Sequence, residues 1–280
     1  MKFLYLVLLF FVFLQSCVSD DFNNMAQGFT PVTPTQAAVM ALDQHNPDKR
    51  REGLTLLANS PFGGSPDYLS LYRNYIEHDR DPLVRAAAIK ALARFGDTED
   101  ALVIVPWLQF ERLESEKLKS TQVRRAASNA LQRLHNPAVV IALLRSLRNQ
   151  DEDSQVRNAS AIALGQYPQP QVFNGLIEGL QSNDLSINLA SAQSLHVLTG
   201  QVFGTDWDAW YAWSDRTLKS NQSLFAYRSD YEYPTYQHEE RWWDSLIFWE
   251  YRIHERPDSP AGLKEDATKS TYEDDDKTSQ

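Results

Sequence analysis

The sequence predicts an all-α protein, an α-solenoid of about five helix pairs with an aromatic-rich cap at its C-terminal end. Three observations lead to this prediction. The sequence repeats at a nearly constant interval, each repeat carries apolar residues at helical spacing, and aromatic residues become concentrated after the last repeat. The chain has 280 residues, of which 42% are hydrophobic, so it is long enough to bury a continuous core.

Residues 1–16 have the composition of a secretory signal peptide. Met1-Lys2 precedes an apolar run from Phe3 to Leu14, which is shorter than the roughly 20 residues that a membrane-spanning helix needs. The stretch Leu14-Gln15-Ser16-Cys17 resembles the lipobox of bacterial lipoproteins, although Gln15 departs from the small or apolar residue usual at that place. The resemblance implies cleavage before Cys17 and attachment of lipid to its sulfur.

The same resemblance implies a lipid-anchored protein of the bacterial cell envelope that faces the periplasm. Val18 follows the cysteine, where Asp would favour the inner membrane, so the outer membrane is slightly favoured. An ordinary signal peptide with a cysteine nearby is the alternative. Residues 17–34 contain few apolar side chains, and we expect them to form a flexible tether.

Four segments of the sequence align with one another, and a fainter copy precedes them. The copies begin at Asn46, Asp81, Ser120, Asp153 and Asp184. One equivalent position in them is occupied by Lys49, Val84, Val123, Val156 and Ile187. The gaps between these residues are 35, 39, 33 and 31 residues, a period that suits stacked helix pairs. A bundle of alanine-rich helices is the alternative.

Each copy is predicted to be a helix. Asp or Ser leads the copies as an N-cap residue, and Pro47 and Pro82 stand near the first helical position. Apolar residues such as Val84, Ala88 and Leu92 follow at helical spacing, and the alanines allow neighbouring helices to approach closely. Another apolar helix is expected before each copy. These preceding helices are expected at about residues 35–44, 66–78, 99–110, 137–148 and 170–181.

The segment from Asp81 to Arg85 resembles the second helix of a HEAT repeat, whose signature is Asp-x-x-x-Val-Arg-x-x-Ala-x-x-Ala-Leu. The segment from Asp153 to Arg157 is nearly as similar, whereas Ser120 replaces the Asp of one copy and Asn188 the Arg of another. The resemblance covers residues 35–200. It implies an α-solenoid whose inner surface binds other macromolecules.

Three arginines, Arg85, Arg124 and Arg157, recur at the same position of the repeat. We expect each to pair with an Asp at the adjacent turn between helices and so to join neighbouring repeats. The expected acidic partners are Asp79, Asp81, Asp151 and Asp153. A ladder of arginines that binds a ligand is the alternative.

The aromatic region, residues 201–256, is predicted to be a helical cap or extension. A helix is expected from Trp207, with Asp206 or Thr205 as its N-cap, and it would cover the last apolar face of the solenoid. Three roles are open for the rings of residues 224–253: folding back onto the solenoid, binding a partner, or entering the headgroup layer of a membrane. The candidate partner-binding residues are Trp242, Trp243, Trp249 and Tyr251. Residues 257–280 predict an acidic disordered tail.

No residue pattern in the chain indicates catalysis, a cofactor or a metal site. The net charge is −10 and no stretch is dense in Lys and Arg, which argues against nucleic acid as a partner. Cys17 is the only cysteine, and Trp242 stands where a zinc-protease helix that begins at His238 would need its second His. We therefore predict a non-catalytic scaffold that binds a protein partner. An enzyme or enzyme subunit with a ligand pocket in the aromatic region, and a structural strut of the envelope, are the alternatives.

Overall fold

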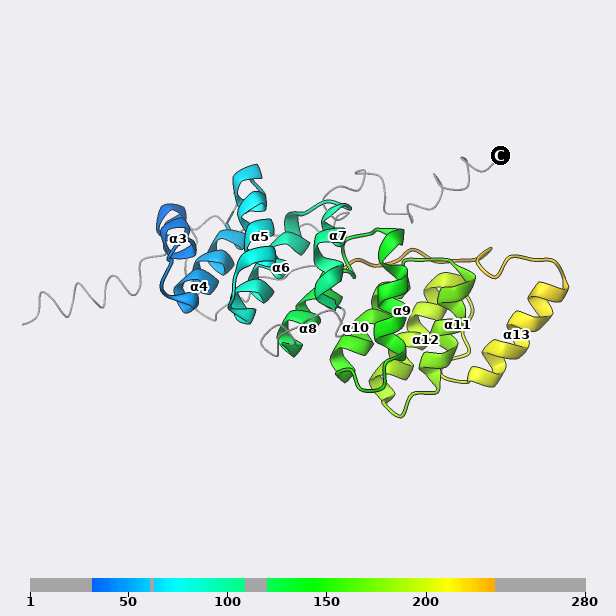
Figure 1. Ribbon diagram of the computed structural model, residues 1–280. Helices are drawn as coiled ribbons and strands as arrows, with labels where there is room; N and C mark the ends of the chain where they lie inside the picture. Colours follow the sequence, from blue (N-terminus) through cyan, green and yellow to red (C-terminus); the bar gives the residue numbers. More distant parts are fainter. Residues whose placement is uncertain (1–31, 61–62, 109–119, 235–280) are drawn as a thin grey trace, which may run out of the picture.

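A computed structural model describes residues 32–60, 63–108 and 120–234, and the regular structure in these ranges is entirely helical. The helices form one elongated row from α3 at one end to α13 at the other (Figure 1). They are α3 (Pro34–Ala41), α4 (Pro47–Ala58), α5 (Pro66–His78), α6 (Pro82–Phe95), α7 (Asp100–Ile104), the 3-10 helix η1 (Val105–Leu108), α8 (Thr121–Ala130), the 3-10 helix η3 (Pro137–Val139), α9 (Val140–Arg148), α10 (Ser154–Leu164), α11 (Pro170–Leu180), α12 (Leu185–Thr199) and α13 (Trp207–Lys219). The predicted all-α solenoid is confirmed.

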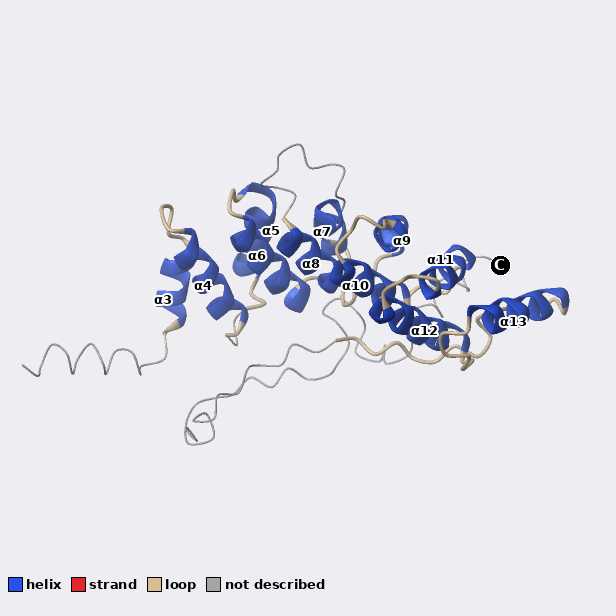
Figure 2. Cartoon of the chain, turned by 90° about the horizontal axis from the view of Figure 1, so that it is seen from below, coloured by secondary structure: helices blue, strands red, loops and turns tan. Residues whose placement is uncertain are grey.

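Twelve of these elements make five successive pairs, with α7 and η1 together, and η3 and α9 together, as the first helices of the third and fourth pairs. The second helices, α4, α6, α8, α10 and α12, pack closely on one another along the whole row. The first helices touch one another less and lie over this layer (Figure 2). The second helices thus form a continuous inner layer. Within the described part of the chain, no helix is long and apolar enough to cross a membrane.

The repeat found in the sequence is the repeat of the core. Val84, Val123, Val156 and Ile187 have no exposed surface, because each is enclosed by the helices packed around it. Lys49, at the same position of the first copy, has a side chain that is 57% exposed. The repeat position of the first copy is therefore exposed, and an apolar residue is not needed there. This explains why the first copy aligns more faintly with the others.

Small residues set the spacing between the helices. Ala88 and Ala127 occupy equivalent positions in α6 and α8, and both are fully buried. Gly53 of α4 lies so close to α3 that a Cβ atom at this residue would collide with the backbone nitrogen of Ala41. Larger side chains at these positions would separate the helices and open voids in the core.

Side-chain caps begin most of the second helices. Asp81 accepts from the backbone N–H groups of Leu83 and Val84, and Asp153 and Asp184 act in the same way in later repeats. Ser120 is the N-cap residue of α8, as predicted, but its side chain makes no capping bond and its hydroxyl donates to Gln122 instead. The position of the cap is therefore confirmed for this copy, whereas its side-chain bond is absent.

One predicted helix is divided in two. The expected helix at residues 99–110 consists of α7, which ends at Ile104, and η1, which includes Pro106. Proline has no N–H to donate to the carbonyl four residues earlier, and its ring crowds that turn. The α-helix therefore gives way to a 3-10 turn at this proline.

The C-terminal aromatic region begins with a helix but does not continue as one. After α13 the chain turns at Asn221, which has a φ of 56°, and residues 222–234 contain no helix. Residues 224–234 run back past α12 and α10 toward the end of α8 (Figures 1 and 2). Folding back onto the solenoid is thus confirmed for this part of the region, whereas the helical extension predicted for it is wrong, because its backbone groups bond to the solenoid instead.

Candidate interaction surface on the second helices

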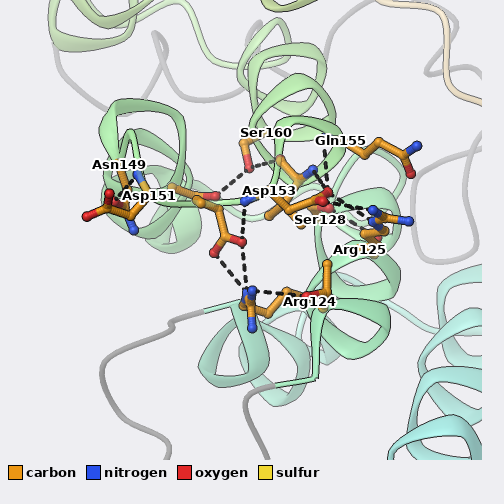
Figure 3. Close-up of polar contacts among 12 residues, drawn as sticks. Arg124, Arg125, Ser128, Asn149, Asp151, Asp153, Gln155 and Ser160 are labelled. Atoms are coloured by element: carbon orange, nitrogen blue, oxygen red, sulfur yellow. Dashed lines mark hydrogen bonds and ion pairs between the residues drawn. The ribbon is translucent and has the colours of Figure 1, made fainter.

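Five arginines join each repeat to the next through a carboxylate 27 to 30 residues away. The pairs are Arg50–Asp79 (2.8 Å), Arg73–Asp100 (2.6 Å), Arg124–Glu152 (2.9 Å), Arg125–Asp153 (2.7 Å) and Arg148–Glu178 (2.5 Å). Figure 3 shows two of them side by side, where Arg124 and Arg125 extend from α8 toward the turn before α10. These pairs hold the register of the stacked helices.

The expectation for the repeated arginines is only partly met. Arg124 does join two repeats, although its partner is Glu152 and not an Asp. Arg85 donates instead to the backbone carbonyls of Ile76 and Asp79, and its guanidinium lies 4.0 Å from the centroid of the Trp107 ring. Arg157 donates to the carbonyl of Leu147. In all three cases the arginine is engaged within the solenoid, which argues against a ladder that binds a ligand.

A groove of about 560 Å³ lies on the inner layer between α8, α10 and the start of α12. It is lined by Arg125, Asn129, Gln132, Ser154, Gln155, Asn158, Ala159, Ile162 and Ser186. Six of these nine side chains are amides or hydroxyls. The single charge belongs to Arg125, which is already paired with Asp153. This ion pair also lowers the pKa of the Asp153 carboxyl, mainly through the hydrogen bonds from Arg125.

Local structure explains why these polar groups face the groove. Asn129 and Gln155 are exposed on the second helices α8 and α10. Asn158 donates to the carbonyl of Ser186, and Gln132 donates to the carbonyl of Ala159, so each of these amides also connects two repeats. The groove is thus held open by bonds between the helices that form it.

Two exposed leucines stand near the groove in sequence, although neither lines it. Leu185 and Leu189 of α12 are 68% and 55% exposed and lie one helical turn apart, and Leu189 is three residues from Ser186 of the lining. Exposed leucines beside polar groups are typical of protein-binding surfaces, where apolar contacts supply affinity and hydrogen bonds supply orientation. The combined surface therefore suits a polypeptide ligand.

The groove itself was not found from the sequence. The signal was present in the repeat register, because Gln122 and Gln155 both stand one residue before the repeat valine. Asn129 follows Gln122 by seven residues, about two helical turns, so the two side chains lie on the same face of α8. Polar residues at fixed offsets from a buried repeat position would have indicated a shared exposed face.

The histidines of the described residues serve packing and helix ends. The His135 ring stacks on Tyr167 with a centroid distance of 4.9 Å, and His196 contacts the carbonyl of Gln201. In the parts of the chain that the structure describes, no group of three or more His, Cys, Asp or Glu side chains could hold a metal ion.

The aromatic helix α13 covers the last repeat. Asp206 caps it, as one of the two predicted candidates, and Trp210 is fully buried with its indole N–H donating to the carbonyl of Gly204. Trp210 meets Phe203 edge to face, and Trp213 lies between Phe203 and Phe173 of α11. On the opposite side, Trp207 and Tyr211 are 42% and 65% exposed. The side of α13 that carries Trp210 and Trp213 therefore acts as the cap.

The remaining predicted site residues lie outside the described residues. These are Cys17, Trp242, Trp243, Trp249 and Tyr251. Their predicted roles in lipid attachment and partner binding stay predictions.

The stacked helix pairs, the buried repeat valines and the bonds between repeats define a helical-repeat solenoid with an exposed inner groove. The model of the HEAT repeats matches residues 35–109 and 111–196, which is more than half of the chain. The chain belongs to the HEAT-repeat family. No curated protein matches the sequence.

Proposed function

We propose that this protein is a lipid-anchored, non-catalytic scaffold of the bacterial cell envelope that binds a protein partner in the groove of its second helices. HEAT repeats commonly mediate protein–protein interaction. The observation that carries the proposal is the groove between α8, α10 and α12, with its lining rich in amides and hydroxyls and with the exposed Leu185 and Leu189 on α12.

The chemistry of the groove favours a polypeptide over a small charged ligand. An amide side chain donates and accepts at once, so it can bond to both the C=O and the N–H of an extended chain. Arg125 is neutralised by Asp153, which leaves no net charge in the lining to attract an ion. Affinity would come from several such bonds together with burial of Leu185 and Leu189.

The same lining supports a non-catalytic role. Acid–base or nucleophilic catalysis needs a group that can take up or release a proton near neutral pH, such as an imidazole, a carboxylate or a thiol. None of the nine residues that line the groove carries one of these groups.

Paired substitutions test the groove. We expect Asn129→Ala with Gln155→Ala to reduce recovery of the partner from detergent-solubilised envelopes roughly tenfold, because two hydrogen-bonding groups of about 0.7 kcal/mol each are lost. The matched control is Gln171→Ala with Asn174→Ala, which removes two exposed amides from α11 on the outer layer. The measurement is quantitative mass spectrometry of proteins that copurify with the three chains. Equal loss in both variants, or loss in neither, would contradict the proposal.

The anchor is supported by the sequence alone, through the signal-like residues 1–16 and Cys17 in the lipobox-like stretch. Each buried CH₂ of an acyl chain contributes about 0.8 kcal/mol, so two or three chains hold a protein durably at a membrane. We expect Cys17→Ser to move the protein from the membrane fraction to the soluble fraction. The control is Ser16→Ala, which leaves the thiol in place. Membrane association of Cys17→Ser equal to that of the wild type would rule out the anchor.

A further inference from the structure

Residues 229–234, called the strap here, lie against the solenoid without any regular structure of their own. The Ser229 N–H donates to the carbonyl of Val197 at the end of α12 (2.8 Å). The Tyr231 hydroxyl donates to the carbonyl of Gln132 (3.1 Å), and Arg133 Nη1 donates to the carbonyl of Pro234 (2.8 Å). The strap therefore crosses from the fifth repeat to the third, against the order of the chain.

The surface beneath the strap, called the shelf, is periodic. It lies at and just beyond the C-terminal ends of α8, α10 and α12, where Gln132, Arg133 and Val197 bond to the strap and Tyr167 lies near Tyr231 and Tyr233. We include Gln166 in the shelf because of its place in the repeat. Arg133, Gln166 and Val197 occupy equivalent positions in three successive repeats. Stacked helices lie about 10 Å apart and an extended chain advances about 3.3 Å per residue, so about three residues cross one repeat.

The match in length explains why the strap fits. Its five steps from Ser229 to Pro234 extend over about 17 Å, close to the distance across two repeats. Gly200 lets the chain approach α12 just before the strap, because its φ of 69° suits glycine and a Cβ atom there would collide with the carbonyl of Tyr227. The strap thus crosses the shelf as an extended chain.

The strap carries partly buried tyrosines at alternate positions. Tyr231 and Tyr233 are partly buried and meet edge to face with ring centroids 5.0 Å apart. Burial raises the pKa of Tyr233 to about 12 and that of Tyr231 well above its usual value. Glu232 lies between the two tyrosines and Asp230 precedes them, and both acidic side chains are exposed. The pattern that the shelf holds is Tyr-x-Tyr with acidic residues facing solvent.

The strap does not satisfy the shelf completely. Gln166 is only 1% exposed, and its amide N–H₂ donates to the carbonyls of Leu131 and Ala163. Its Oε1 atom is buried without a hydrogen-bond partner. In the repeat register Gln166 lies midway between Arg133 and Val197, which both bond to the strap. A ligand with a donor at this place would gain a hydrogen bond that the strap lacks.

We propose that the shelf is a second binding site, which recognises an extended Tyr-x-Tyr segment of a protein partner, and that the strap occupies it in cis until such a segment replaces it. The proposal rests on the scaffold function and adds the chemistry of a partner. The shelf is lined by backbone carbonyls, Arg133 and Gln166, whereas the groove is lined by other side chains. A tethered segment competes at an effective concentration in the millimolar range, so a partner must bind well to displace the strap.

The test uses the full chain in detergent and a fluorescein-labelled peptide of residues 226–234. In the wild type, the strap should exclude the peptide. In Tyr231→Ala with Tyr233→Ala the strap loses its two rings, and we expect saturable binding, measured by fluorescence anisotropy, at least tenfold tighter than to the wild type. A peptide with both tyrosines replaced by alanine is the control ligand and should not bind.

Three further results decide the outcome. Unchanged helical circular dichroism of the double variant, together with faster hydrogen exchange confined to residues 224–234, establishes that the strap and not the solenoid was released. A folded double variant that does not bind the peptide overturns the proposal. A concentration-dependent dimer of the wild type that the double variant does not form also overturns it, because the replacing segment would then come from a second copy. The groove variants change Asn129 and Gln155, neither of which bonds to the strap, and Tyr231 bonds to the backbone carbonyl of Gln132 and not to the Gln132 side chain that Asn129 contacts. Loss of partner recovery and loss of peptide binding are therefore distinguishable.

Discussion

At the scale of single residues, the ion pair of Arg124 with Glu152 is the least exposed ion pair between repeats in the described residues, with side chains 5% and 2% exposed. Two charges removed from water are tolerated only while they hold each other, since each alone would keep its desolvation cost. Glu152 also accepts from the N–H of Asp153, so one carboxylate fixes both the arginine and the turn before α10.

We expect Glu152→Ala to destabilise the protein by about 3 kcal/mol, because it leaves the Arg124 guanidinium buried without its carboxylate. The control is Asp215→Ala, which removes the exposed partner of Lys219 and should change the stability little. Urea unfolding followed by circular dichroism measures both. Equal midpoints for the two variants would show that the buried pair is not needed.

The partners of the arginines could not be predicted from their repeat position alone. Arg50, Arg85 and Arg124 are equivalent in sequence, yet Arg50 and Arg124 bind carboxylates of the next repeat while Arg85 binds backbone carbonyls of its own pair. The partner of each arginine depends on whether the next repeat has a carboxylate within reach. Asp79 before α6 is the partner of Arg50 and Glu152 before α10 is the partner of Arg124, whereas the Trp107 ring lies over Arg85.

At the scale of helices, two residues with the same predicted role behave differently. Asp81 caps α6 by accepting from two N–H groups, whereas Ser120 makes no capping bond to α8. We expect Asp81→Ala to lower the free energy of unfolding by about 1 kcal/mol and Ser120→Ala to leave it nearly unchanged. Thermal unfolding of the two variants compares them directly. A larger loss from Ser120→Ala would contradict this assignment of the caps.

Helices that depend on local signals were predicted well, and segments that depend on distant contacts were not. The expected helices at 66–78 and 137–148 coincide with α5 and with η3 together with α9, because proline and apolar spacing mark their ends. The strap is too short to show a helical period, and its bonds from Tyr231 and Pro234 join residues about 100 positions away in sequence. Composition alone could not separate such a segment from a helical extension.

At the scale of the whole molecule, the solenoid needs an end that does not expose its core. Trp210 supplies it, because its fully buried ring closes the space between Phe203 and α13. We expect Trp210→Ala to cost about 3 kcal/mol, since a large cavity would form at the last repeat. Trp207→Ala is the control, because that ring is 42% exposed. Urea unfolding measures both, and similar losses would show that α13 is not a cap.

The number and order of the repeats followed from the sequence, whereas the groove did not. The buried valines from Val84 to Val156 mark the repeat because a core position accepts few residue types. Asn129 and Gln155 come together only because α8 and α10 stack in a particular register, which pairs such as Arg125–Asp153 determine. A surface that spans repeats depends on that register, and single segments of sequence do not contain it.

The hydrogen bond between Arg133 and the carbonyl of Pro234 closes a loop of about 100 residues, from α8 to the strap. A pulling force applied to the chain beyond residue 234 would therefore reach the middle of the array first, and it would act parallel to the shelf and not peel α13 from the end. The last two repeats would bear load only after the hydrogen bond between Arg133 and Pro234 had broken. In single-molecule stretching, the protein would then extend first by the length of the strap and only later by whole repeats.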